Sequence, residues 1–238
     1  TMTERGQKQL AQSPDCLRIG PSSFTWEKDH LVIEFNEYSI PHFDRVKGTV
    51  KIFPENITNI ECNLLPDNSH IWRPFAPTSR IEVQINRPGW NWNGHGYFDA
   101  NFGSSALEKD FSYWTWGRFP SNNGSVAFYD ALPRKNNPLH LAIRFKRNGE
   151  IEPIETPPPI TRMPRSLWLV KRTTRSDLGF KPRQIKHMLD APFYTRSAIE
   201  TSILGERVTG VHEALDLNRF ANPALKPLLA VKAPRYTW

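Results

Sequence analysis

Alternation of apolar and polar residues with a period of two is the feature that most restricts the fold of this chain. Residues 81–85 (Ile-Glu-Val-Gln-Ile) alternate at every position, and 31–35, 126–129 and 139–145 are similarly rich in β-branched and aromatic residues. Such segments predict β-strands. Further predicted strands are 50–52, 166–170, 195–203 and 208–215.

Helical signals are few. We expect short helices at Arg5–Ala11 and Leu217–Leu229, the second interrupted by Pro223 and Pro227. Residues 146–150 contain an Asn-Gly pair and predict a hairpin loop. The 21 prolines and the short, evenly spaced strands indicate an all-β barrel or sandwich.

The positive charge is concentrated in the last third of the chain. Residues 160–238 contain 14 Lys/Arg and 6 Asp/Glu, whereas residues 1–159 contain 17 and 18. This asymmetry suits an anionic membrane surface, although an evenly solvated basic face would also produce it. Nucleic acid is not expected as a partner, because its binding would place basic and aromatic residues on one surface. Here the aromatic residues lie in the neutral part.

Other classes of protein find little support. No run approaches 18 consecutive apolar residues, so no membrane-spanning helix is expected. Two cysteines, Cys16 and Cys62, are too few for a secreted disulfide framework and point weakly to a reducing compartment. The sequence has no phosphate-binding glycine motif, no zinc-spaced cysteine pair and no nucleophile elbow.

Aromatic and polar residues are densest between Trp90 and Asp130. Four of the eight tryptophans fall within 27 residues of this segment. A packed core is the commoner origin of such a cluster, and a ligand pocket is the alternative. The candidate substrate-binding residues are Trp92, His95, Trp114, Trp116 and Tyr129.

A strand through His95-Gly-Tyr-Phe-Asp99 would place His95, Tyr97 and Asp99 on one face. These side chains could form a polar site or a mutually satisfied buried network. His95 and Asp99 could also contribute to a metal site, with His70 as a third ligand. The neighbouring Gly96 and Gly103 allow close approach of backbone or ligand.

Several longer motifs resemble the carotenoid 1,2-hydratase (hydroxyneurosporene synthase) family, and together they cover essentially the whole chain. The most specific is Trp92–Gly103, which contains Gly-His-Gly-Tyr-Phe-Asp-Ala-Asn-Phe-Gly. The others are Met2–Gly6, Ala191–Ser197, Gly205–Glu213 and Leu217–Ala221.

The resemblance implies two lipocalin-like antiparallel β-barrel domains and a hydratase that needs no cofactor and no metal. Its substrates would be water and an acyclic carotenoid of the lycopene or neurosporene type. The family's active-site residues map onto His70, Trp72, Tyr97 and Asp99. Such an enzyme would lie on the cytoplasmic side of the photosynthetic membrane and contact its anionic surface peripherally.

One departure from the family pattern affects the expected domains. Family members carry a longer segment before Thr-Glu-Arg-Gly, so the first barrel is expected to lack strands. The expected division is 1–80 for the remainder of the first barrel and 81–155 for the active-site strands. Residues 156–238 would form the second, basic barrel, with the proline-rich 155–159 as a linker.

Acid catalysis is the expected mechanism, with Asp99 as the acid. A buried carboxyl can stay protonated and donate to carbon. His70 or Tyr97 would orient Asp99 or the water, and Trp72 and Trp116 would face the cation. Three alternative interpretations concern single residues. Asp99 could instead cap a turn at Ala100-Asn101, and Asp130 is a rival proton donor. His212 could make a hydrogen bond that only supports the scaffold.

Two other functions remain open from sequence. The chain could be a barrel protein that binds a carotenoid or lipid without catalysis. It could also be a related barrel enzyme that acts on another isoprenoid.

Overall fold

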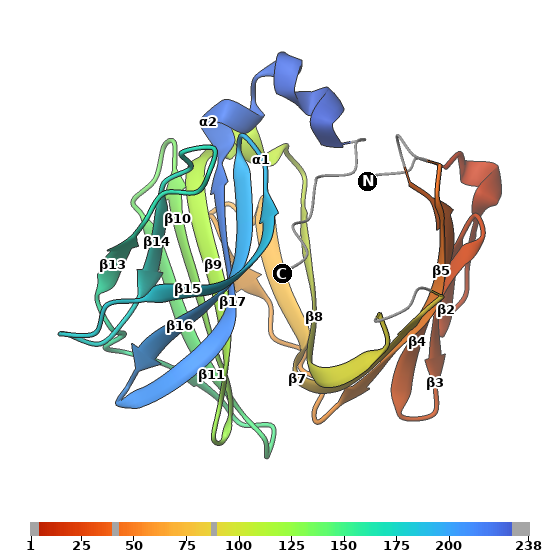
Figure 1. Cartoon of the computed structure of the whole chain (residues 1–238), viewed down its shortest axis with the longest axis horizontal. Coiled ribbons are helices and arrows are strands. Elements are labelled where there is room, and N and C mark those ends of the chain that lie inside the picture. Colours follow the sequence, from red (N-terminus) through yellow and green to blue (C-terminus); the bar gives the residue numbers. More distant parts are fainter. Residues whose placement is uncertain (1–4, 40–42, 87–89, 230–238) are drawn as a thin grey trace. The chain divides into compact units, whose positions relative to one another are not determined.

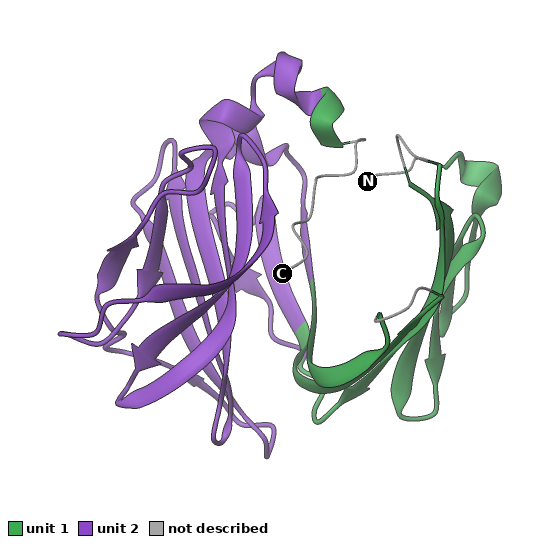
Figure 2. Cartoon of the chain, viewed as in Figure 1, with its two compact units in different colours: residues 1–58, 75–99, 227–232 green, residues 59–74, 100–226, 233–238 purple. Residues whose placement is uncertain are grey.

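The computed structural model describes residues 5–39, 43–86 and 90–229. Within these ranges the chain forms two compact units, which Figure 2 colours separately. Of the described residues, unit 1 contains 5–39, 43–58, 75–86, 90–99 and 227–229, and unit 2 contains 59–74 and 100–226. Antiparallel strands dominate both units (Figure 1), which confirms the predicted all-β class.

An eight-stranded antiparallel sheet has the order β1-β2-β3-β4-β5-β7-β6, and β8 also pairs with β7. Its strands are β1 (Leu10–Gln12), β2 (Cys16–Ile19), β3 (Ser22–Glu27), β4 (His30–Tyr38), β5 (Arg45–Pro54), β6 (Cys62–Asn63), β7 (His70–Ile85) and β8 (Trp92–Gly103). In unit 1 the register pairs Leu31 with Ile52 and Val50 with Val83, so apolar side chains of β4, β5 and β7 lie side by side.

Strands β7 and β8 each continue from one unit into the other. Gly96 lies against Ser79 and Ile81, whereas Gly103 lies against Ser69 and His70. The later position on β8 therefore faces the earlier position on β7, so the two strands are antiparallel. A methyl group at Gly96 would lie 3.1 Å from Ile81 Cβ, which confirms that glycine permits this approach.

A seven-stranded antiparallel sheet in unit 2 has the order β12-β11-β10-β9-β17-β16-β15. Its strands are β9 (Phe111–Ser121), β10 (Gly124–Pro133), β11 (Leu139–Lys146), β12 (Ile151–Pro153), β15 (Arg183–Asp190), β16 (Tyr194–Ile203) and β17 (Glu206–Asp216). In the described residues this sheet is open, with β12 and β15 at its edges. Strands β13 (Ile160–Met163) and β14 (Arg172–Arg175) form a separate two-stranded sheet.

The hydrophobic core of unit 2 is built on one face of the large sheet. Phe119 of β9 and Phe128 of β10 have ring centroids 6.2 Å apart, and both are buried. Val208 of β17 and Ile199 of β16 complete this face, and Met163 of β13 packs against it. Burial alternates along β16 and β17, as the sequence predicts, whereas β9 and β10 in the middle of the sheet are buried on both faces.

Two predicted elements are wrong. Ser166–Val170 forms a turn in which Leu169 has a φ of 60°, a conformation incompatible with a strand. The helix expected at 5–11 is only the 3-10 helix η1 (Gln7–Gln9), after which β1 begins. The hairpin loop at 146–150 is confirmed, with Gly149 at a φ of 89°.

The C-terminal helical segment is divided as its prolines predict. Helix α2 (Leu217–Phe220) ends before η2 (Pro223–Leu229), a 3-10 helix that contains Pro227. The remaining helix, α1 (Leu107–Asp110), precedes β9. Within the described part of the chain, no helix is long and apolar enough to cross a membrane.

The proline-rich residues 155–159 connect β12 to β13 inside unit 2. Arg175 Nη1 donates to the Pro158 carbonyl at 2.9 Å, which packs the segment against β14. The division at residues 80 and 155 stays a prediction about domains. Both cysteines are free, and burial raises the pKa of the Cys62 thiol to about 11.

Candidate active site

Strand β7 begins with two of the predicted catalytic residues, both in unit 2. Alternation along His70-Ile71-Trp72 places His70 and Trp72 on the same, buried face of the strand. Their side chains therefore enter the interior of unit 2 next to β9, and not the solvent.

His70 has a carboxylate partner that the sequence did not predict. Its Nε2 lies 2.8 Å from Asp110 Oδ2, and the Ser105 hydroxyl donates to the same oxygen. The hydrogen bonds from Ser105 and His70 lower the pKa of Asp110 below 3.8, so this carboxyl is an anion at neutral pH. A carboxylate can only accept, so Nε2 of His70 is the donor in this hydrogen bond.

The end of β8 lies against the other side of His70. A methyl group at Gly103 would lie 2.8 Å from His70 Nδ1 and would overlap the Ser69 carbonyl oxygen. Glycine at this position therefore lets β8 approach the His70 ring and the backbone of β7.

Three of the predicted substrate-binding aromatics gather with Trp72 in unit 2. Trp114 and Trp116 share one face of β9, and the register pairs Trp116 with Tyr129 of β10. The Tyr129 ring stacks on Trp114 at 5.3 Å between centroids and lies 5.7 Å from Trp72. This face is opposite to the one that carries Phe119, so the cluster is separate from the core of the sheet.

The second pair of predicted catalytic residues lies on β8 in unit 1. Tyr97 Oη donates to Asp99 Oδ2 at 2.8 Å, as expected for residues two apart on one face of a strand. Phe98 points to the other face and stacks on Phe75 at 5.7 Å between centroids. Strand β8 continues to Gly103, so the alternative in which Asp99 caps a turn at Ala100-Asn101 is wrong.

The remaining β8 candidates, Trp92 and His95, are exposed; Trp92 retains 53% of its accessible surface. Neither belongs to the cluster around Trp72. No group of three or more potential metal ligands occurs among the described residues.

Two other candidates have partners within unit 2. Arg175, itself buried, makes two hydrogen bonds to Asp130 at 2.6 and 3.0 Å, and His140 Nδ1 lies 2.7 Å from the same carboxylate. Both carboxyl oxygens of Asp130 are therefore engaged by Arg175. His212 Nε2 donates to the Thr173 carbonyl at 2.7 Å, in agreement with a scaffold role.

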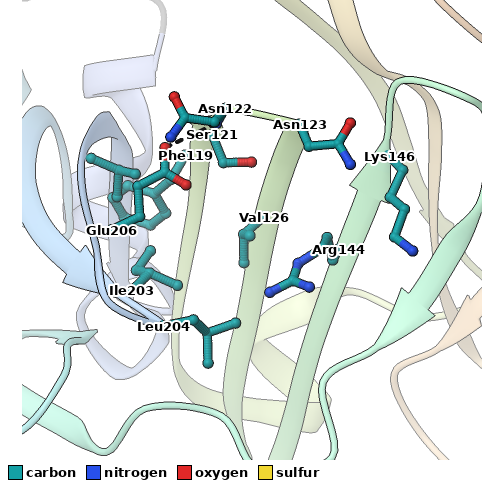
Figure 3. Close-up of a pocket in the computed structure, with 11 residues that line it drawn as sticks. Phe119, Ser121, Asn122, Asn123, Val126, Arg144, Lys146, Ile203, Leu204 and Glu206 are labelled. Atoms are coloured by element: carbon teal, nitrogen blue, oxygen red, sulfur yellow. Dashed lines mark hydrogen bonds between the residues drawn. The ribbon is translucent and has the colours of Figure 1, made fainter.

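A small hollow opens at the β9–β10 end of unit 2 (Figure 3). It encloses about 150 Å³ and combines apolar residues such as Val126 with Arg144 and Glu206. Pockets for drug-sized ligands enclose about 300–1,000 Å³, so this hollow cannot accommodate a long polyene.

Comparison with known proteins agrees with the predicted resemblance. The family described as carotenoid hydratase CrtC matches residues 1–238. An acyclic carotenoid 1,2-hydratase of Cereibacter sphaeroides is 52% identical over 236 residues, which cover 99% of this chain and 84% of that protein. The protein of the same name from Rhodobacter capsulatus is 48% identical with the same coverage. That of Rubrivivax gelatinosus is 36% identical, and the match covers 58% of its length. The chain therefore belongs to the carotenoid hydratase family.

Proposed function

We propose that this protein is a hydro-lyase that adds water across the terminal C1–C2 double bond of an acyclic carotenoid, by acid catalysis and without a cofactor. The names of its relatives support the substrate class. The hydrogen bond from Tyr97 to Asp99 is the structural observation that carries the acid assignment.

Asp99 is the proposed proton donor. Tyr97 occupies Oδ2 as a hydrogen-bond donor, so a proton held by this carboxyl lies on Oδ1. Transfer of that proton to C2 forms the C2–H bond from the alkene electron pair and leaves a tertiary cation at C1. The Tyr97 hydroxyl then stabilises the carboxylate that remains, which favours the transfer.

Trp72 is the proposed partner of the carbocation, and Trp116 is expected to assist it. The faces of indole rings attract positive charge, and a cation desolvated by aromatic walls gains most from this attraction. Burial of Trp72 in the cluster with Tyr129 fixes its ring for this task. Aromatic walls also exclude bases that would remove the proton and reverse the reaction.

His70 is the proposed base for the last step. Water adds to C1 through an oxygen lone pair, and the resulting oxonium must lose a proton. Because Asp110 fixes Nε2–H, His70 can accept that proton on Nδ1. Return of the proton to Asp99 through solvent completes a cycle whose net change is the addition of one water molecule.

The proposal includes a location. The enzyme is expected to act peripherally at an anionic membrane, on its cytoplasmic side, because an acyclic carotenoid partitions into lipid and the last third of the chain is basic.

Incubation of the purified chain with detergent-dispersed lycopene in heavy-oxygen water tests the function. We expect mass spectrometry to detect one labelled hydroxyl for each hydrated end. A chain that binds the pigment but forms no labelled product would instead be a binding protein. Labelled product from a shorter prenyl chain but not from lycopene would point to another isoprenoid substrate.

A further inference from the structure

The turn between β13 and β14, next to α2 in Figure 1, presents three consecutive large apolar side chains to solvent. Leu167, Trp168 and Leu169, here called the apolar tip, retain 72%, 51% and 59% of their accessible surface. Single exposed apolar residues are common on proteins, but an adjacent set marks a surface for interaction.

The backbone of the turn is fixed although its side chains are exposed. Ser166 accepts two hydrogen bonds: its carbonyl from Leu169 N at 2.9 Å and its hydroxyl from Val170 N at 3.2 Å. Leu169 has a φ of 60°, a left-handed conformation that branched residues rarely adopt. Val170 is fully buried and anchors the turn to unit 2.

Side chains of two other elements of unit 2 make hydrogen bonds to the backbone of the turn. Asp190 Oδ2, at the end of β15, accepts from Leu167 N at 2.7 Å. Arg219 Nη1, in α2, donates to the Trp168 carbonyl at 2.7 Å. These two hydrogen bonds hold the backbone of the turn, so the apolar tip is presented in a fixed orientation.

Two cations flank the apolar tip. Arg165 and Lys171 are exposed, and among the described residues neither has a carboxylate within ion-pair distance. Lys171 Nζ instead lies 5.9 Å from the centre of the Tyr113 ring. A tryptophan and two leucines between unpaired cations have the composition of a segment that enters a bilayer interface.

We propose that the apolar tip inserts into the interfacial region of an anionic lipid bilayer, while Arg165 and Lys171 contact lipid phosphates. A protein partner fits less well, because a stable protein interface needs about 800 Å² on each side and one three-residue tip supplies only part of that. This inference rests on the proposed peripheral location and assigns to it a docking surface, and the test by vesicle binding does not depend on hydration.

Sedimentation of the full 238-residue chain with vesicles tests the proposal. Vesicles of phosphatidylcholine mixed with phosphatidylglycerol are compared with vesicles of phosphatidylcholine alone. The variant replaces all three residues of the tip (Leu167→Ser, Trp168→Ser, Leu169→Asn), and asparagine is chosen because it tolerates a positive φ. The matched control is Leu178→Ser, which removes a side chain 90% exposed at the other end of β14.

We expect the wild-type chain to bind the anionic vesicles and the tip variant to bind them at least about tenfold more weakly. Leu178→Ser should bind like the wild type. Replacing both cations (Arg165→Gln, Lys171→Gln) should weaken binding and reduce its sensitivity to salt. Trp168→Phe should keep binding but lose the blue shift of tryptophan fluorescence that vesicles produce.

Equal binding by the wild type and the tip variant would overturn the proposal. So would a wild-type chain that ignores anionic vesicles, whatever its activity in detergent. Self-association that the tip variant abolishes, without vesicle binding by the wild type, would assign the tip to contact with a second copy instead.

Discussion

Replacement of Gly103 by alanine tests how closely β8 approaches His70. The added methyl group would overlap the Ser69 carbonyl oxygen and lie 2.8 Å from His70 Nδ1. That carbonyl already accepts from Ser104 N at 3.0 Å, so the end of β8 cannot move away without straining this bond. Overpacking of this kind costs about 1–3 kcal/mol.

Gly94→Ala is the matched control, because it makes the same change on the same strand. The nearest atom to its methyl group would be a carbon of the Trp92 ring at 3.7 Å, an ordinary contact. Alanine there should leave stability unchanged or raise it by about 0.4–1 kcal/mol, since it restricts the unfolded chain.

Thermal unfolding of the two variants provides the measurement. In a chain of this size, 1 kcal/mol changes the melting temperature by about 2–4 °C. We therefore expect Gly103→Ala to melt about 2–12 °C below the wild type. Gly103→Ala should also lose activity, because its methyl group covers the proposed base. Equal melting temperatures for Gly103→Ala and Gly94→Ala would refute the close approach.

Substitutions at three residues of unit 2 provide further tests. Burial lowers the pKa of His212 from 6.5 to about 4, so the native state resists protonation and stability should fall as the pH drops from 6.5 to 4. Urea unfolding at several pH values should show a smaller loss of stability for His212→Gln than for the wild type. Identical pH profiles for the two proteins would contradict this prediction. Hydrogen bonds from Ser105 and His70 lower the pKa of Asp110. The stability that this ionised carboxyl contributes is therefore present above pH 3.8 and is lost as the pH falls below it. Asp110→Asn should therefore flatten the stability profile below about pH 4, and an unaltered profile would exclude a stabilising dyad. Trp72→Ala should lower the free energy of unfolding by about 3–5 kcal/mol, and Trp72→Phe by much less, because the ring of Trp72 is fully buried. Unchanged stability of the alanine variant would mean that the cluster is not packed.

Several strands of this fold could be predicted from sequence because apolar and polar residues alternate along them. Segments such as 81–85 and 195–203 carry that alternation themselves. Ser166–Val170 has the composition of a strand, but contacts from Asp190 and Arg219, far along the chain, hold it in a turn. Local pattern cannot reveal such distant hydrogen bonds.

The candidate site was predictable in part. Tyr97 and Asp99 are two residues apart on a strand, so their shared face follows from periodicity. The pairing of His70 with Asp110 joins residues 40 positions apart through α1, and no motif links them. The Glu-Lys-Asp sequence of α1 has the composition of an exposed polar turn and does not indicate that Asp110 pairs with His70.

The central claim is that Asp99 delivers the proton that begins hydration. Its most direct test compares the wild type with Asp99→Asn on lycopene in heavy-oxygen water, with the labelled hydroxyl measured by mass spectrometry and the fold checked by circular dichroism. We predict labelled product from the wild type and loss of at least about a hundredfold in the folded variant, as expected when a general acid is removed. Retained turnover in a folded Asp99→Asn variant would contradict the assignment.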